Sequence, residues 1–254
     1  MLTQNQIKHI RSLQQKKFRN ELNQFLAEGP KLVEELIDSR FSFDSIYALK
    51  PWLDEHAERL GSKEIPFTEI TEKELERISG LTTPHSVLAV LNTPENILPK
   101  NIFGNDVVLV IDNIKDPGNL GTIIRTADWF GIDNIVCSET TVDVYNPKVI
   151  QATMGSIARV SVFYADLAAV LKDHAKDVVV YGTFMTGKPI AEFKPEKNSI
   201  IVLGNESTGI SENLFPFIQH KVSIPLHRPA GKKNPESLNA SVAAAIMCYE
   251  FRKK

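Results

Sequence analysis

The stretch DNIKDPGNLGTIIRTADWFG, residues 112–131, combines an asparagine and an arginine with a glycine-rich turn that leads into a predicted helix. Asn119 is expected at the mouth of this helix, and Arg125 about 1.5 turns further along it. An arginine can hold a phosphate through two parallel hydrogen bonds or can polarise a hydroxyl, and a helix that follows such a turn is typical of an anion site. Two plainer interpretations stay open: Asn119 only caps the helix, and Arg125 is an exposed side chain along the sheet edge.

Other polar residues follow apolar runs in the second half of the chain. Thr183 follows DVVVYG, Glu206 follows SIIVLG, and Ser237 and Asn239 precede the last predicted helix. Because ligands of open parallel sheets bind at the carboxyl ends of the strands, these residues are predicted to gather at one edge. Here too a plainer interpretation exists, with Glu206 as a turn carboxylate and the serine–asparagine pair as a helix cap.

Several common catalytic motifs are missing from the sequence. The glycines of residues 112–131 lack the GxGxxG spacing that a nucleotide-dependent dehydrogenase needs, and no GxxxxGK[ST] P-loop occurs. The six histidines show no metal-ligand spacing, so no metal is expected. Neither a GxSxG elbow nor a Cys–His signature is present.

The elements that must position the polar residues divide the chain into two α/β parts. Over residues 1–92, apolar runs and amphipathic stretches alternate as βαβαβαβ, which predicts a small α/β domain, with a capping box of Thr71 and Glu74 at the start of one helix. Residues 93–105 lack periodicity and contain prolines and a glycine, so they are predicted to be a linker. Over residues 106–254, six nearly continuous apolar runs predict strands buried on both faces, and hence a parallel sheet. Helices are predicted at about 118–130, 147–155, 166–174 and in the Ala-rich C-terminal stretch.

The composition is that of a globular cytoplasmic protein. Hydrophobic residues make up 43% and charged residues 24% of the chain, which is ordinary for such proteins. No apolar run reaches the ~18–20 residues that span a bilayer, and the N-terminus lacks the apolar core of a signal peptide. Only two cysteines occur, which favours a reducing compartment.

Local charge suggests a polyanionic partner, although the net charge is −2. Two basic clusters could follow a phosphate backbone. They consist of Lys8, Arg11, Lys16, Lys17 and Arg19 near the start of the chain, and of Lys221, Arg228, Lys232 and Lys233 in a later loop. The plainer interpretation is a solvated helix face and a solvated loop.

Three segments together resemble the three motifs of the SpoU-type (TrmH-like) branch of the SPOUT RNA methyltransferases. Residues 112–131 resemble the first motif, IVLGNESTGIS resembles the second, and VSIPL with ESLNASVAAAI resembles the third, in the family's order. The N-terminal half, with its opening FLAEGPKLVEELI, is similar to the small α/β RNA-binding domain that precedes the catalytic domain in many members. The resemblance covers nearly the whole chain.

The resemblance implies a homodimeric ribose 2′-O-methyltransferase that uses S-adenosylmethionine and acts on RNA, with rRNA favoured over tRNA. It also implies an α/β SPOUT domain with a parallel sheet and a trefoil knot near the C-terminus. Matched residue by residue, it assigns catalysis to Asn119, Arg125, Glu206, Ser237 and Asn239. It assigns the cofactor to Thr183, Gly204, Asn205, Ile224, Leu226 and Leu238, and RNA contacts are expected from Arg11, Lys16, Lys17, Arg228, Lys232 and Lys233.

The role of Arg125 stays open between a base and a clamp, and so does the subunit whose site it serves. Because a guanidinium keeps its proton, with a pKa above about 12, we expect Arg125 to polarise the ribose hydroxyl or an adjacent phosphate, with Asn119 orienting it. The loop HRPAGKKNPE, 227–236, is longer than the family pattern and is predicted either to grip RNA or to alter cofactor access. The alternatives are a tRNA enzyme and an RNA-binding protein without catalysis on the same fold.

Overall fold

The computed structural model describes residues 1–227 and 236–253. The chain forms two compact units, Met1–Glu95 with Asp143–Ala158, and Asn96–Val142 with Arg159–Lys254. This division differs from the predicted domains at residues 143–158, which pack with the N-terminal part of the chain. The predicted linker, residues 93–105, is partly packed into the second unit, because Ile102 and Phe103 are buried in the core of that unit.

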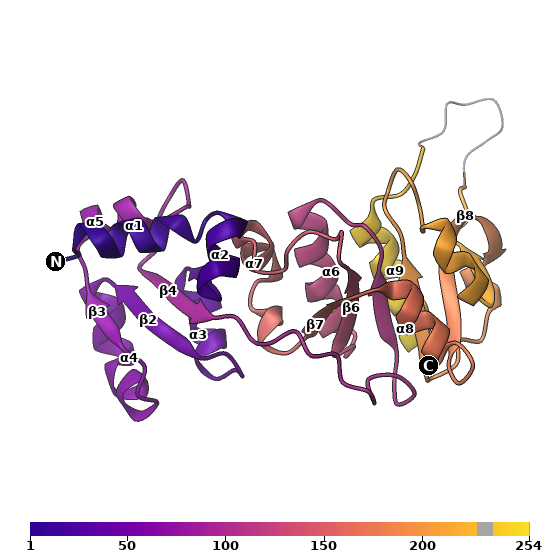
Figure 1. The fold of residues 1–254 in the computed structure, drawn as a ribbon, viewed down its shortest axis with the longest axis horizontal. Helices are drawn as coiled ribbons and strands as arrows, with labels where there is room; N and C mark the ends of the chain where they lie inside the picture. The colour runs from indigo at the N-terminus through magenta and orange to yellow at the C-terminus, as the bar shows by residue number, and fades with distance from the viewer. Residues whose placement is uncertain (228–235, 254) are drawn as a thin grey trace. The chain divides into compact units, whose positions relative to one another are not determined.

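The first unit is a four-stranded mixed sheet covered by helices on both faces (Figure 1). Its elements are α1 (Gln4–Ser12), α2 (Lys16–Leu22), β1 (Gln24–Glu28), α3 (Pro30–Ile37), β2 (Phe43–Ala48), α4 (Lys50–Ser62), β3 (Phe67–Glu69), α5 (Glu72–Ile78) and β4 (Val87–Asn92). The strand order is β1-β4-β2-β3, with β4 antiparallel to both of its neighbours and β2 parallel to β3. The predicted alternation of strands and helices from residue 24 onward is therefore confirmed.

Apolar side chains at helical spacing explain α1, which the predicted alternation did not include. Ile7, Ile10 and Leu13 are buried together with side chains of α5 and of one sheet face. A capping box of Thr3 and Gln6 starts α1, and the predicted box of Thr71 and Glu74 starts α5. Each box satisfies backbone N–H groups that the first helical turn leaves without partners.

The second unit is built on a six-stranded sheet in which all neighbours are parallel, as predicted. The strand order is β10-β8-β9-β5-β6-β7, from β5 (Val108–Ile111), β6 (Asn134–Ser138), β7 (Ser161–Ala165), β8 (Val179–Pro189), β9 (Ser199–Leu203) and β10 (His220–Ser223). The helical elements are α6 (Pro117–Trp129), α8 (Leu167–His174), α9 (Ala240–Arg252) and the short turns η2 (Ile190–Glu192) and η3 (Glu212–Phe217).

Helices cover both faces of this sheet, which accounts for the continuous apolar strands. Side chains of α8 and η3 pack with alternate residues of the central strands, among them Val110 and Val202. Helices α6 and α9 pack against each other, and α9 also packs against β9. Along the part of the chain that the structure describes, no helix is both long and apolar enough for a bilayer crossing.

The remaining stretch, 143–158, contains α7 (Pro147–Thr153) and the turn η1 (Ser156–Ala158). It lies between β6 and β7 in the sequence but belongs to the first unit, where α7 packs against β1. The predicted helix at this position is confirmed. The first unit is therefore assembled from two separate parts of the chain.

Candidate active site

An excursion in β8 forms one wall of the site. Pairing of β8 with β10 breaks after Gly182 and resumes at Lys188, so residues 183–187 leave the ladder. The excursion closes at Gly187, where an added Cβ would lie 2.6 Å from the carbonyl oxygen of Lys221, and the hydroxyl of Ser223 donates to the Gly187 carbonyl at 2.9 Å. Only a residue without a side chain fits this close backbone approach, which fixes where the excursion ends.

The loop after β9 forms the second wall and is held by its own hydrogen bonds. The backbone groups of Asn205 and Gly209 bond to each other in both directions, at 3.0 and 2.9 Å. The Asn205 side chain accepts from the backbone N–H of Ser207 at 2.9 Å and donates to the carbonyl of Asn113 at 2.9 Å. At Gly204 an added Cβ would lie 2.3 Å from the backbone carbon of Gly209. The loop therefore turns back on itself so closely that only glycine fits at residue 204.

These walls enclose a cavity of about 500 Å³, completed by the chain after β10 and by the start of α9. The structure brings all six predicted cofactor residues together around it, namely Thr183, Gly204, Asn205, Ile224, Leu226 and Leu238. Glu206 and Ser237 line it as well. Residues predicted from three separate segments of the sequence thus line one continuous cavity.

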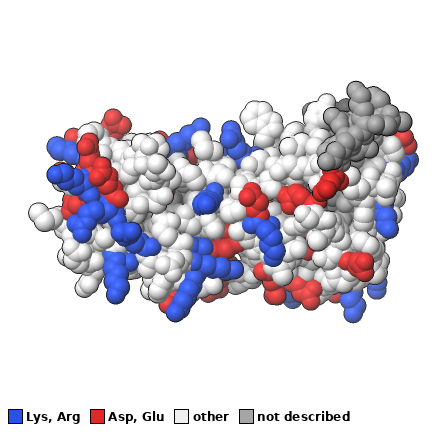
Figure 2. Space-filling view, turned by 90° about the horizontal axis from the view of Figure 1, so that it is seen from above, with Lys and Arg blue, Asp and Glu red and all other residues white. Residues whose placement is uncertain are grey.

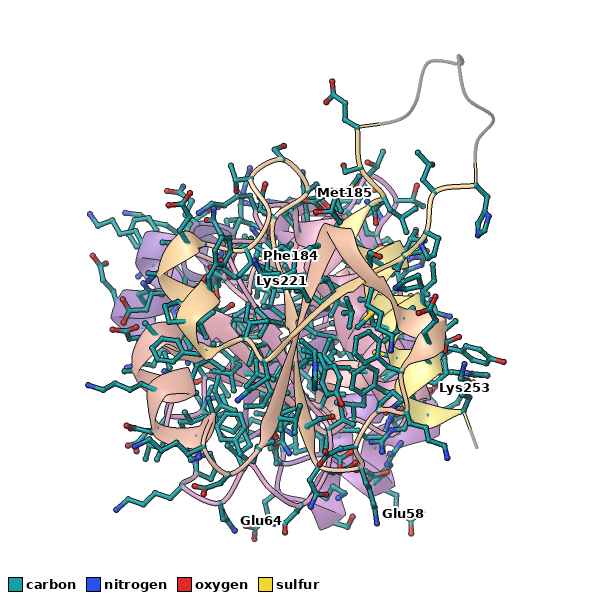
Figure 3. All side chains as sticks on the ribbon, turned by 90° about the vertical axis from the view of Figure 1, so that its right-hand side faces the viewer. Glu58, Glu64, Phe184, Met185, Lys221 and Lys253 are labelled. Carbon is teal, nitrogen blue, oxygen red and sulfur yellow. The ribbon has the colours of Figure 1, made fainter. Side chains whose placement is uncertain are left out.

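Sequence reasoning missed the apolar lining, which includes Phe184, Met185, Phe215, Ala243 and Met247. Helical spacing from Ala240 through Ala243 to Met247 was the available signal for the α9 side. Lys221 Nζ lies 5.1 Å from the ring centroid of Phe184 and 5.2 Å from that of Phe215. Figure 3 shows Lys221 beside Phe184 of β8, with Met185 further out along the excursion.

A chain of hydrogen bonds joins the three polar segments at the edge of the cavity. The side-chain amide of Asn119 on α6 donates to the Glu206 carboxylate, and its oxygen accepts from Asn239 Nδ2 at 2.9 Å. Asn239 caps α9, because its oxygen accepts from the backbone N–H groups of Ser241 at 2.9 Å and Val242 at 3.3 Å. One asparagine thus connects the loop after β9 with the beginning of the last helix.

These contacts correct two expectations about Asn119. It is not the helix cap: Asp116 is, because its carboxylate accepts from the backbone N–H of Asn119 at 2.8 Å. Nor does Asn119 orient Arg125, since its amide group is engaged by Glu206 and Asn239. Arg125 is exposed on α6, does not line the cavity, and forms no hydrogen bond or ion pair with any residue that the structure describes.

A buried carboxylate that the sequence argument did not single out supports the loop from below. Asp112 is 4% exposed, and its Oδ2 accepts from the backbone N–H of Ser211 at 2.8 Å. Its neighbour Asn113 has a φ of 58°, in the left-handed region, where asparagine is tolerated better than most residues. The turn between β5 and α6 therefore holds the loop after β9 at two points, Ser211 and Asn205.

The basic residues predicted to contact RNA have different positions. Lys8, Arg11, Lys16 and Lys17 are exposed on or beside α1 and α2, where Figure 2 shows basic and acidic side chains interleaved on the first unit. Arg19 is only 3% exposed, so it does not belong to this surface. Arg228, Lys232 and Lys233 lie outside the described residues.

Other reactive groups do not compete for a role in the site. Burial raises the pKa of Cys137 and raises that of Cys248 to about 12, so both thiols stay protonated and unreactive at neutral pH. Within residues 1–227 and 236–253, no group of three His, Cys, Asp or Glu side chains is arranged to hold a metal ion.

Comparison with known proteins agrees with this geometry. Residues 106–249, which contain the cavity, match the profile described as the SpoU rRNA Methylase family. The chain belongs to the SpoU rRNA methylase family. Residues 4–89 of this SpoU methylase match the MRM3-like substrate binding domain. The 23S rRNA (guanosine(2553)-2′-O)-methyltransferase RlmP of Bacillus subtilis (strain 168) is 33% identical over 97% of this chain and 95% of its own length.

Solved structures resemble the SpoU methylase over both units. A putative RNA methyltransferase of the TrmH family from Porphyromonas gingivalis is 35% identical, with a TM-score of 0.85 over 99% of this chain and 98% of that one. An AdoMet-bound rRNA methyltransferase from Sinorhizobium meliloti is 29% identical, with a TM-score of 0.85 over 99% and 95%. The expected SPOUT fold, RNA methyltransferase activity and use of S-adenosylmethionine are therefore confirmed.

Proposed function

We propose that this SpoU methylase transfers a methyl group to a ribose 2′-hydroxyl of rRNA. The observation that carries the proposal is that the second and third sequence motifs line one cavity, with the first motif joined to its edge through the Glu206–Asn119–Asn239 chain. The relative from Bacillus subtilis, named as a 23S rRNA 2′-O-methyltransferase, supports both the substrate and the position of the methyl group.

The cavity suits S-adenosylmethionine, which supplies an electrophilic methyl group when it is bound. Its volume of about 500 Å³ is within the usual range for small-molecule sites. Phe184, Phe215 and Met247 offer apolar surface for a purine base. Gly204 and Gly209 line the cavity without side chains, so that polar atoms of a ligand can bond to main-chain groups there. A carboxylate at the edge, Glu206, favours a cationic ligand.

In this proposal, the hydrogen bonds among Glu206, Asn119 and Asn239 orient the edge of the cavity and hold the loop after β9 in one position. Glu206 accepts from Asn119, so its carboxylate has a fixed direction at the cavity edge. Asn239 fixes the start of α9, which keeps Ser237 and Leu238 against the cavity. Alignment of a hydroxyl with a methyl group can contribute several kcal/mol to catalysis by itself, so a rigid cavity edge is functionally important.

Arg125 is proposed to act in the site of a partner subunit. On α6, Arg125 precedes Trp129 by one helical turn, and both are exposed, Trp129 by 85%. On α9, which packs against α6, Tyr249 is 56% and Val242 46% exposed. Exposed apolar side chains on adjoining helices mark an association surface, and a second copy of the chain covers it in our proposal. Arg125 would then clamp the ribose hydroxyl or a neighbouring phosphate of RNA bound to the partner.

We also infer a trefoil knot near the C-terminus and a cytoplasmic location. Membership of the SpoU family supports the knot. Two buried and unpaired cysteines support a reducing compartment.

Methyl transfer from radiolabelled S-adenosylmethionine tests the function. The purified protein is incubated with rRNA and, separately, with tRNA from cells that lack it, and 2′-O-methylated positions are mapped. We expect one modified ribose in rRNA. Modification of tRNA alone would support the tRNA alternative, and binding of RNA without any methyl transfer would support the non-catalytic one.

A subunit-mixing experiment tests the position of Arg125. Arg125→Ala removes the clamp and Gly204→Ala blocks the cavity, so each variant alone should be inactive. If Arg125 serves the partner's site, mixed dimers contain one intact site and recover activity. If it serves its own site, the mixture stays as inactive as the two variants.

A further inference from the structure

Segment 143–158 is part of the SpoU-matched sequence but packs in the unit that contains the substrate binding domain. The chain therefore passes between the units three times, after residues 95, 142 and 158. Both ends of the segment continue into strands of the parallel sheet, β6 and β7. The contacts that hold residues 143–158 in the first unit can therefore affect the catalytic unit through these two covalent connections.

A buried ion pair fixes the beginning of the segment. Arg19 Nη2 and Nε donate to Asp143 Oδ2 at 2.6 and 3.1 Å, and Nη1 donates to the carbonyls of Leu13 and Gln14 at 3.0 Å each. The side chain of Arg19 is 3% exposed and that of Asp143 14%. Removal of either charge would leave the other nearly buried without a partner, which is strongly unfavourable. The pair therefore holds the turn between α1 and α2 to the segment.

Aromatic packing fixes the next residues of the segment. The ring of Tyr145 lies 4.7 Å from that of Phe25 and 6.5 Å from that of Phe41. Burial raises the pKa of Tyr145 to about 12. Val149 and Ile150 of α7 are also fully buried. The segment is thus a tightly packed part of the first unit.

Within the second unit, the residue before the segment is bonded to the loop that supports the candidate site. The backbone N–H of Val142 donates to the carbonyl of Ile114 at 2.8 Å, and the hydroxyl of Tyr164 donates to the Val142 carbonyl at 2.6 Å. Ile114 is fully buried in the turn between β5 and α6. Its neighbour Asn113 accepts from Asn205 of the cavity wall. A continuous path therefore leads from Asp143 to the loop after β9.

We propose that Arg19 and Asp143 are positioning residues for RNA methylation, which act on the cavity wall through Val142, Ile114 and Asn113. The ion pair sets the place of residue 143, and the backbone bond of Val142 passes this position to the turn that holds Asn205. RNA engagement by the first unit is coupled in this way to the geometry of the site. The proposal rests on the proposed rRNA methyltransferase function, and contiguous packed networks of this kind are able to carry such coupling.

Asp143→Asn tests the coupling, because it keeps the shape of the side chain but removes the charge and replaces one of the two acceptor oxygens with an amide group. Arg19→Lys is the conservative partner variant, which keeps the charge and loses the forked geometry. Asp38→Asn is the matched control, since Asp38 pairs with Arg59 and Lys63 at the surface of the same unit. Amide hydrogen exchange over residues 113–116 and 144–153, S-adenosylmethionine titration, and kcat and KM with rRNA are measured for each.

For Asp143→Asn we expect faster exchange in both stretches and a kcat lowered by about tenfold, with the KM for rRNA and the affinity for S-adenosylmethionine within twofold of wild type. Arg19→Lys should lie between Asp143→Asn and wild type, and Asp38→Asn should match wild type. Faster exchange with an unchanged kcat would make the pair merely structural and overturn the proposal. Unchanged exchange or a parallel loss of cofactor binding would overturn it too. Failure of the proposed function is separate, because the wild type itself would then methylate no rRNA.

Discussion

Replacement of Asn119 by alanine is the most direct perturbation of the candidate site. Asn119 donates to the Glu206 carboxylate and accepts from Asn239, whereas the cap of α6 belongs to Asp116. The substitution therefore removes the connection between two cavity segments and leaves the helix start intact. Alanine is also the residue with the best helix propensity, so the backbone of α6 is not expected to suffer.

The magnitude follows from the two lost bonds. A hydrogen bond to a charged acceptor contributes about 1.5–3 kcal/mol and a neutral one about 0.5–1.5 kcal/mol. Because neither bond is fully buried, the lower ends apply, and the sum is about 2 kcal/mol. If this energy orients the site in the transition state, kcat/KM falls by about 30-fold.

Asn239→Ser is the matched control for this prediction. Serine caps a helix about as well as asparagine does, so the variant keeps a cap on α9 and loses the donor to Asn119 without adding a charge. We expect kcat/KM to fall by only about two- to fivefold, since a single exposed neutral bond is lost.

Methyl transfer to rRNA, S-adenosylmethionine titration and urea unfolding separate the outcomes for Asn119→Ala. The reasoning is refuted if kcat/KM stays within threefold of wild type while the free energy of unfolding falls by about 2 kcal/mol, because the bonds would then only stabilise the fold. An equal loss of activity in Asn239→Ser would also contradict it, because the two variants differ in the bond to Glu206.

Three further predictions concern single features of the fold. Gly204→Ala places a Cβ 2.3 Å from the backbone of the same loop. Overpacking of this kind should weaken S-adenosylmethionine binding by about tenfold or more, and calorimetry measures this affinity. Hydrogen bonds from the backbone N–H groups of Thr71 and Leu2 lower the pKa of Glu74 to about 2. The stabilising effect of the Glu74 carboxylate is therefore complete above about pH 4.5 and is lost as the pH falls toward 2. Glu74→Gln should remove this part of the pH dependence of the free energy of unfolding. Combined replacement of Arg11, Lys16 and Lys17 by alanine should weaken RNA binding and reduce the slope of log K against log salt by about 2, and unchanged binding at several salt concentrations would contradict it.

Much of the fold follows from local patterns in the sequence. Continuous apolar runs such as VVLVI and SIIVLG need burial on both faces, and the structure places them as neighbouring parallel strands, β5 and β9. The carboxyl ends of neighbouring parallel strands must lie at one edge of the sheet, which is why the sequence alone predicts that Thr183 and Glu206 lie near each other.

Long-range contacts set the limit of that reasoning. Charge alone put Arg19 with Lys16 and Lys17, but its partner Asp143 is 124 residues away in the chain, and no local pattern reveals such a pair. The position of Asn119 at the start of the helix likewise suggested a cap. The cap is Asp116 instead, and the side-chain amide of Asn119 donates to Glu206, which is distant in the sequence. Helix α7 was predicted as an element, but its packing against β1 was not.

The assembly of the first unit from two parts of the chain has a consequence for recombination between relatives. A chimera joined at residue 95 would combine one protein's strand β1 and Arg19 with another protein's Asp143 and Tyr145, and so would mismatch a buried charge pair and an aromatic cluster. The functional module for exchange is therefore residues 1–95 together with 143–158, although these stretches are separated by two strands and a helix of the catalytic unit. Substitutions in Arg19 and Asp143 should accordingly be inherited as a pair, across what the sequence presents as a domain boundary.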